Sequence, residues 1–309
     1  MLDRIVVVAK KTPLEELLVR QSFSQAAFFL AQRGTSIEEY QAAHKQYQES
    51  LTTVIASLPK SVPHAVINRE MIAGFLFREN DLLIVIGPDG LCVNVAKYIS
   101  DQPILAVNPD RKRIDGVLMR IKPSEIKTMI AEAQQNGLLT ESVTLAKVTT
   151  NDGQSLYAVN DFLIGRRDQV SARYTIEWRG KKERQSSSGI LVSTGVGSTG
   201  WLASVMGGES AGLRWDSQEL VFAVREPFPS KYTGASIIFD HIKRGESLRV
   251  ISEMPEGGFI FSDGVPEDAI EFNSGTIAVV AAAERSAKLA VPRRAGCELP
   301  SIEKVFSKI

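Results

Sequence analysis

The sequence predicts an α/β protein of two domains: an N-terminal open, Rossmann-like α/β domain and a C-terminal all-β domain of β-sandwich character. Two observations predict it. Unbroken apolar runs alternate with helical patterns over roughly the first 140 residues, and the later apolar segments are short, alternating and separated by turn residues. The length of 309 residues also favours two domains. We expect them at 1–138 and 139–284, with the C-terminal segment, about 285–309, returning to the first.

The first elements carry clear local signals. Ile5–Ala9 is a β-branched run typical of a strand. In the following TPLEE segment, Thr12 can cap a helix, Pro13 fits its first position, and Glu15 completes a capping box. A strand followed by a helix is therefore expected at the N-terminus.

The rest of the first half repeats this alternation. A helix is expected from Ser36 to near Pro59, because apolar residues recur there at three- and four-residue steps. Unbroken apolar runs, typical of buried parallel strands, lie at 65–67, 82–86 and 104–107. Helices are expected at 91–100 and 122–134. The order implies an open sheet flanked by helices.

The pattern changes near Gly137. Asp152-Gly153 between two apolar segments is a strong hairpin signal. Strands are expected at 143–150, 155–164, 172–178, 219–224, 235–239, 247–252, 258–262 and 276–283, and a final one at 288–292. Many short strands in this order favour a sandwich or Greek-key arrangement.

Composition excludes several functional classes. Lys plus Arg equals Asp plus Glu at 36 each, so no global field favours nucleic acid or membrane. No run approaches the ~20 apolar residues of a membrane span. Two cysteines, Cys92 and Cys297, give no disulfide framework, and three scattered histidines give no metal cluster. We expect a cytoplasmic protein that acts on small molecules.

The segment Gly87-Pro88-Asp89-Gly90 lies between a buried strand and a helix. Glycines let a backbone approach a ligand, and a helix N-terminus offers free N–H groups to phosphate. Asp89 would stand at the carboxyl end of a strand, where it could accept a hydroxyl proton or help to hold a metal ion. Pro-Asp-Gly is equally a good turn sequence, so this motif alone leaves both interpretations open.

Two further segments carry polar groups in apolar surroundings. Asn160-Asp161 interrupts an apolar strand, and buried polar groups need partners, which a ligand or a strand end could supply. Residues 194–200, TGVGSTG, follow the apolar run ILVS and precede Trp201. Such a loop can wrap a nucleotide through backbone N–H and hydroxyl groups, although it lacks the lysine of a P-loop. A plain glycine-serine turn is the alternative.

In this order and at these separations, the three segments resemble the NAD kinase family, which carries Gly-Gly-Asp-Gly-Thr, an Asn-Glu/Asp pair and a Gly-Ser-Thr loop. The segments AVNDFLIG, SARY (171–174), SSG and TGVGS resemble its mitochondrial-type branch most. The likeness covers roughly residues 80–205, with a weaker echo at Ser262-Asp-Gly264. The family fold, an α/β domain followed by a β domain, agrees with the organisation expected above.

The resemblance implies phosphoryl transfer from ATP, or from polyphosphate in some members, to the 2′-hydroxyl of the adenosine ribose of NAD(H), with Mg²⁺. It makes Asp89 the catalytic aspartate, which could also help to hold the metal ion. Gly87 and Gly90 are then the residues that shape its turn. It implies that the dinucleotide is bound by Asn160, Asp161, Ser188, Thr194, Gly197, Ser198, Thr199 and Trp201. A homodimer or higher homo-oligomer is also implied.

This sequence departs from the family at several positions. Pro88 and Leu91 replace a glycine and a threonine, which removes an N–H and a hydroxyl on the phosphate side, and Trp201 replaces a tyrosine. Two other functions therefore stay open: a kinase of another hydroxyl substrate, such as a sugar or nucleoside, and a non-catalytic NAD/NADP sensor. The basic run Arg111-Lys112-Arg113 could meet phosphates or lie in a solvated loop.

Overall fold

The structure, a computed structural model, describes residues 2–209 and 211–293. These residues form two compact units, 2–141 with 288–293 and 142–287. The boundaries expected from the sequence, 138/139 and 284/285, each lie three residues earlier. Residues 294–309 of the expected C-terminal return lie outside the described residues.

The first unit is built on a parallel sheet in the order β2-β1-β3-β4. Its strands are β1 (Arg4–Ala9), β2 (His64–Asn68), β3 (Asp81–Ile86) and β4 (Pro103–Val107). Lys288 and Leu289, near the end of β16 (Ile277–Ala290), pair in parallel with β4. Every residue of β3 is buried, which explains its unbroken apolar run.

Helices cover this sheet. α3 (Ile37–Ala56) and α5 (Ile126–Gln135) pack their apolar residues, among them Val54 and Met129, against Ile84 of the sheet. α4 (Asp89–Ala96) follows β3 almost directly. The helical turns η1 (Arg69–Gly74) and η2 (Pro123–Glu125) complete the connections.

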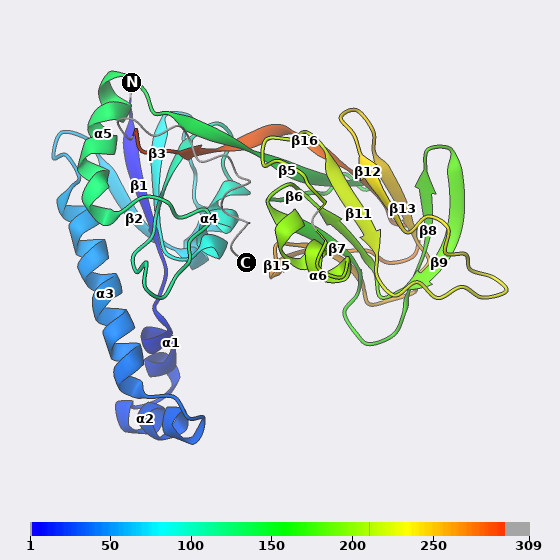
Figure 1. Ribbon diagram of the computed structural model, residues 1–309, viewed down its shortest axis with the longest axis horizontal. Coiled ribbons are helices and arrows are strands. Elements are labelled where there is room, and N and C mark those ends of the chain that lie inside the picture. The colour runs from blue at the N-terminus through cyan, green and yellow to red at the C-terminus, as the bar shows by residue number, and fades with distance from the viewer. Residues whose placement is uncertain (1, 210, 294–309) are drawn as a thin grey trace. The chain divides into compact units, whose positions relative to one another are not determined.

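At one end of α3, α1 (Pro13–Arg20) and α2 (Phe23–Gln32) form a small apolar cluster with its first turns (Figure 1). The expected capping box is confirmed: the Thr12 hydroxyl accepts from the N–H of Glu15, whose carboxylate accepts from the N–H of Thr12. The sequence patterns above did not predict α2.

The second unit contains two groups of strands. An antiparallel sheet has the order β12-β11-β10-β7-β14-β15. These strands are β7 (Asp161–Arg166), β10 (Ile190–Ser193), β11 (Leu220–Val224), β12 (Phe239–Ile242), β14 (Gly258–Ser262) and β15 (Val265–Glu271). The other group pairs in the order β16-β13-β8-β9, with β5 on β16 and β6 on β5. These strands are β5 (Thr140–Thr150), β6 (Ser155–Ala158), β8 (Ala172–Trp178), β9 (Lys181–Ser187) and β13 (Leu248–Ser252).

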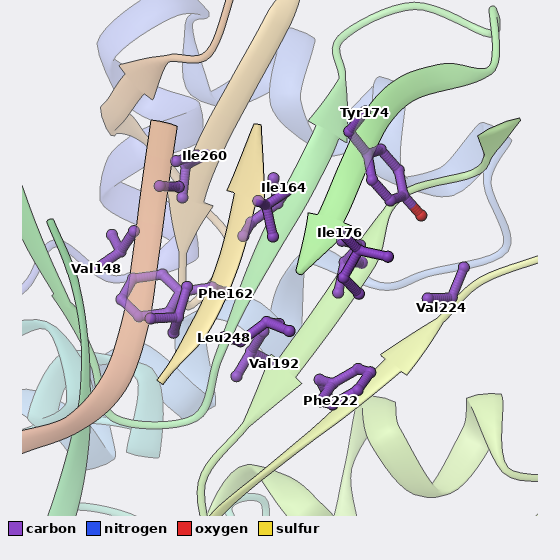
Figure 2. Packing of buried hydrophobic residues seen from close by; sticks show 14 of the residues in the cluster. Val148, Phe162, Ile164, Tyr174, Ile176, Val192, Phe222, Val224, Leu248 and Ile260 are labelled. Atoms are coloured by element: carbon purple, nitrogen blue, oxygen red, sulfur yellow. The ribbon is translucent and has the colours of Figure 1, made fainter. Parts of the chain in front are cut away.

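The core of this unit lies between the two strand groups, as in a sandwich (Figure 2). Phe162, Ile164 and Phe222 come from the first sheet, and Ile176 and Leu248 from the second group. Alternate residues of β7 enter this core, which is the period of two expected for strands. The sheets therefore give a rigid frame to the loops at their ends.

Three strand predictions were wrong. The separate strands expected at 276–283 and 288–292 are one continuous strand, β16. The segment 155–164 is two strands, β6 and β7, which belong to different sheets and are separated at Val159-Asn160. The strand expected at 235–239 begins only at Phe239. There the N–H groups of Ser236 and Ile237 donate to the Glu183 carboxylate, so a side chain takes the place of a neighbouring strand.

The hairpin expected at Asp152-Gly153 is confirmed, because β5 and β6 pair antiparallel across it. The helix expected at 91–100 begins two residues earlier and ends at Ala96. Helical patterns in a fully buried helix are difficult to delimit, since all of residues 91–96 are buried and no polar face marks the ends.

Candidate functional site

The segment Gly87-Pro88-Asp89-Gly90 links β3 to α4 in the first unit. The carbonyl of Pro88 accepts from the N–H of Leu91 at 3.0 Å, which closes the first turn of the helix. The Leu91 side chain is buried, and a Cβ atom on Gly87 would lie 3.0 Å from its Cδ2 atom. Leu91 thus packs beneath the turn, and Gly87 leaves room for it.

The carboxylate of Asp89 is held by the loop that follows β4. Its Oδ1 accepts from the N–H groups of Leu118 and Met119 at 3.0 and 3.2 Å, and its Oδ2 accepts from Val117 at 3.0 Å. A carboxylate has about four acceptor positions, so about one stays open, on Oδ2. Asp89 can therefore accept one further proton donor without leaving its place.

The basic run lies in the same loop. The Arg111 guanidinium donates to the carbonyl of Arg120, and Arg113 forms an ion pair with Asp110 at 2.5 Å. The backbone N–H of Lys112 donates to that Asp110 carboxylate. Two of the three basic side chains therefore brace their own loop.

In the second unit, Asn160-Asp161 lies where the chain passes from β6 to β7. The carboxylate of Asp263 accepts from three consecutive N–H groups here: Val159 at 3.0 Å, Asn160 at 2.7 Å and Asp161 at 3.2 Å. The N–H of Asp263 donates in return to the carbonyl of Asp161 at 3.0 Å. One aspartate therefore fixes the backbone of the whole Asn-Asp motif.

Asp263 was not among the site residues nominated from the sequence, although Ser262-Asp-Gly264 was a weak part of the family resemblance. It lies with Gly264 in the tight turn between β14 and β15, at φ angles of 54° and 67°. Asp-Gly is a common pair in such turns, and that dipeptide was the available signal. Nothing in the dipeptide indicates that its carboxylate reaches a loop about 100 residues earlier.

The glycine-rich loop packs against the same motif. The N–H of Thr194 donates to the carbonyl of Asn160 at 2.9 Å. The Thr194 hydroxyl donates to the carbonyl of Val159 at 2.5 Å and accepts from the N–H of Gly197 at 3.3 Å. A Cβ atom on Gly197 would lie 2.2 Å from the backbone carbonyl oxygen of Asn160, so only glycine fits. We call residues 159–161, 194–200 and 263 together the motif cluster.

Within this cluster, hydroxyl groups differ in availability. Ser198 is fully buried, and its hydroxyl donates to the carbonyl of Gly195 at 2.8 Å. The Thr199 side chain is exposed, with its hydroxyl 3.4 Å from the carbonyl of Val196. Ser198 therefore braces the loop, whereas Thr199 can reach a ligand.

Trp201 and Ser188 lie outside the motif cluster. Trp201 begins the short helix α6 (Trp201–Val205), and the guanidinium carbon of Arg225 is 5.2 Å from its ring centroid. Ser188 precedes the opposite end of β10, five residues before Ser193 and so roughly 16 Å away along an extended chain. Its hydroxyl donates to Glu226. Within this chain, Ser188 is not brought to the Asn-Asp motif.

The Asp161 side chain has an unusual environment. It is 7 % exposed, and burial, followed by the nearby Asp263 charge, raises its pKa to about 7. Among the described residues its carboxyl oxygens have no hydrogen-bond partner, and Asp161 faces Ser193 of β10 in the strand register. A buried carboxyl group of this kind favours a ligand that supplies the missing hydrogen bonds.

No group of three or more His, Cys, Asp or Glu residues in the described part could hold a metal ion. Asp89 has about one open acceptor position, on Oδ2, which is enough for one carboxylate to share a metal ion whose other ligands come from elsewhere. No helix among the described residues is both long enough and apolar enough to cross a membrane.

Comparison with known proteins adds a direct likeness. No model of a known protein family matches the chain. Proteins named NAD kinase from Hydrogenovibrio crunogenus and Cytophaga hutchinsonii are each 30 % identical to it, over 141 and 135 residues. These matches cover 43 and 41 % of this chain. The NAD kinase of Saccharophagus degradans is 28 % identical over 149 residues, 46 % of this chain. The matches span 45–49 % of the length of those relatives, about half.

Solved structures match nearly the whole chain. An NAD kinase from Archaeoglobus fulgidus, solved with ATP, superposes with a TM-score of 0.58 and 16 % identity over 93 % of both chains. A yeast NADH kinase, solved with NADH, gives 0.61 and 15 % identity over 95 % of this chain and 84 % of that one. The chain has the NAD kinase fold. The expected fold class, an open α/β domain followed by a β-sandwich-like domain, is thereby confirmed.

Proposed function

We propose that this protein is an NAD(H) kinase-like phosphotransferase, which moves the terminal phosphoryl group of ATP to the 2′-hydroxyl of the adenosine ribose of NAD. The observation that carries the proposal is the motif cluster, in which Asn160-Asp161 and the glycine-rich loop pack together in a chain with the NAD kinase fold. Three relatives named NAD kinase support the same reaction.

In this proposal Asp89 is the catalytic carboxylate. As the hydroxyl oxygen bonds to phosphorus, the bond from phosphorus to ADP breaks, and the open acceptor position on Asp89 Oδ2 takes the hydroxyl proton. Such transfer needs positioning and charge neutralisation more than covalent chemistry. The three N–H groups that hold the carboxylate supply the positioning. Gly87 and Gly90 shape the turn that presents it.

The proposed dinucleotide-binding residues are those nominated from the sequence. They fall into two sets: residues whose side chains are available to a ligand, and residues whose side chains hold the loop in place. Asn160 has no side-chain hydrogen bond among the described residues, Asp161 has an unpaired carboxyl, and Thr199 is exposed, so these three can contact ligand through side chains. The hydroxyls of Thr194 and Ser198 brace the loop. Gly197 keeps the glycine-rich loop packed against the Asn-Asp motif. Trp201 offers an aromatic face to the dinucleotide. Ser188 is proposed to contact the dinucleotide at a place more distant from the motif.

Mg²⁺ is the proposed metal. When bound with ATP it would neutralise the phosphate charge that develops during transfer. Asp89 is the carboxylate nominated for the metal; because about one acceptor position is open, on Oδ2, holding Mg²⁺ would be an alternative to taking the hydroxyl proton. The phosphates would therefore supply most ligands of the metal.

Finer assignments rest on the sequence. We place the protein closest to the mitochondrial-type branch because of AVNDFLIG, SARY and the SSG segment. A homodimer or higher homo-oligomer and a cytoplasmic location stay predictions.

The direct test is to incubate the purified protein with ATP, Mg²⁺ and NAD or NADH and to measure NADP(H). We expect product from wild type and a loss of about 100-fold or more with Asp89→Asn, because the proton acceptor is removed. The matched control is Asp115→Asn, which changes an exposed aspartate in the loop that holds Asp89. This variant should keep full activity. NAD binding should survive in both variants.

Two outcomes would redirect the proposal. Tight NAD binding without NADP from any donor would favour the sensor, which is consistent with the loss of donors at Pro88 and Leu91. Turnover of a sugar or nucleoside but not of NAD would favour another acceptor. An Asp89→Asn enzyme with full activity would remove Asp89 from the catalytic role.

A further inference from the structure

Lys10 lies directly beside the Gly-Pro-Asp-Gly turn. It follows β1, which pairs in parallel with β3, and Val8 faces Val85 in the register, so two residues later Lys10 is level with Gly87. A Cβ atom on Gly87 would lie 3.7 Å from the Lys10 Cγ atom. The lysine stem therefore runs along the turn at the carboxyl edge of the sheet, where open α/β sheets bind ligands.

Tyr47 of α3 fixes this position. The N–H of Lys10 donates to the Tyr47 hydroxyl at 3.0 Å, and that hydroxyl donates to the carbonyl of Ile86 at 3.2 Å. Burial raises the pKa of Tyr47, so the phenol stays a neutral donor. One side chain thus ties the ends of β1 and β3 together and orients the start of the lysine.

No carboxylate among residues 2–209 and 211–293 forms an ion pair with Lys10. Some other cations of this unit have carboxylate partners: Arg4 with Asp81, Arg113 with Asp110, Arg120 with Glu141 and Lys288 with Asp101. Lys10 has no ion pair or side-chain hydrogen bond among the described residues, and its side chain is half-buried. Asp89, the nearest acidic residue of the turn in sequence, directs its carboxylate to 117–119.

We propose that the Lys10 ammonium group binds a phosphate of the nucleotide held at this turn. The assignment rests on the proposed function and deepens it. Pro88 has no N–H and Leu91 no hydroxyl, so the turn itself offers phosphate fewer donors than a Gly-Gly-Asp-Gly-Thr turn would. An ammonium group on a stem fixed beside Gly87 supplies positive charge at the place where those donors are missing.

The test compares Lys10→Met with Lys11→Met, which changes the next lysine along the chain, whose side chain is exposed. Methionine keeps the apolar stem and removes the charge. Affinities for ATP, NAD and adenosine are measured by calorimetry, with thermal unfolding as a check on folding. We expect Lys10→Met to weaken ATP or NAD binding about tenfold or more, to leave adenosine binding unchanged, and to be rescued in part by Lys10→Arg.

Each arm has a defined meaning. Loss confined to ATP assigns Lys10 to the triphosphate, loss confined to NAD assigns it to the pyrophosphate, and loss of both supports a shared role. The proposal is overturned if Lys10→Met binds ATP and NAD as wild type does, or if it loses adenosine binding equally. It is also overturned if Lys11→Met has an equal effect, or if wild type binds neither ATP nor NAD. NADP formation is scored separately, so a protein that binds ATP through Lys10 but makes no NADP contradicts the kinase proposal alone.

Discussion

Asp89 and Asp263 hold the backbone in the same way. Each carboxylate accepts three consecutive main-chain N–H groups, those of 117–119 and of 159–161. Main-chain donors without a partner are costly, so each aspartate stabilises the loop that it touches. Asp89 could be nominated from the sequence because it lies in a strand–turn–helix segment. For Asp263 the sequence offered only the weak Ser262-Asp-Gly264 echo, because its contact with residues 159–161 depends on the tertiary structure.

Asp161 gives a prediction about pH. Its folded-state pKa of about 7 lies above the ordinary value of about 3.9, so the folded protein keeps a proton that the unfolded chain releases. The free energy of unfolding should therefore fall as pH rises from about 4 to 7. Asp161→Asn removes this penalty, and we expect it to be more stable than wild type by up to about 4 kcal/mol at pH 8, with a smaller gain at pH 5.

Urea unfolding at pH 5 and pH 8 measures this difference. Asp168→Asn is the control, because a hydrogen bond from Arg166 lowers the pKa of Asp168 to about 2. Its contribution is complete above about pH 4 and is lost only as pH falls toward 2, so its effect should be equal at both pH values. An Asp161→Asn effect that does not grow from pH 5 to pH 8 would contradict the prediction.

Among the elements, those with a strong local signal were predictable. The Thr12 capping box, the Asp152-Gly153 hairpin and the buried strand β3 each follow from residues close together in the sequence. The division of 155–164 into β6 and β7 did not follow. Both strands contain apolar residues, and the break depends on Asp263 and Thr194, which reach Val159-Asn160 from the β14–β15 turn and from the loop after β10. A polar pair within an apolar run marked the place without indicating its cause.

This contact gives a prediction at the scale of elements. Asp263→Ala leaves the N–H groups of Val159, Asn160 and Asp161 without their acceptor, so we expect a loss of roughly 3 kcal/mol in the free energy of unfolding. NAD affinity should fall at least about tenfold, because the motif backbone is released.

The matched control is Asp152→Ala. Asp152 also precedes glycine in a turn between antiparallel strands, but its carboxylate bonds only within its own turn, to Thr150 and Gln154. It should keep wild-type NAD affinity in the same calorimetric titration. Equal losses of affinity in the two variants would mean that Asp263 acts as a general turn residue and not through the motif.

At the scale of the whole molecule, the β unit depends on the core between its strand groups. Phe162 is fully buried there, between Asp161 and Leu163 of β7 (Figure 2). We expect Phe162→Ala to lower the free energy of unfolding by about 3–5 kcal/mol, because the substitution leaves a cavity. Denaturant unfolding measures it, and Phe228→Ala, at a phenylalanine that is 66 % exposed, should change it little. Similar costs for both would refute this assignment of the core.

The sequence by itself determined the fold class and nominated most, but not all, of the residues of the candidate site. Strand and helix periods, glycine turns and polar pairs are local patterns, and they survive in the chain whatever its distant contacts. Only the tertiary structure decided which groups are still available for ligand: it engages Thr194 and Ser198 in the loop, brings Asp263 to Asn160 and leaves Lys10 beside Gly87. The physical reason is that hydrogen bonds and packing between distant segments follow from the order in which non-consecutive strands lie beside one another, which no local pattern encodes.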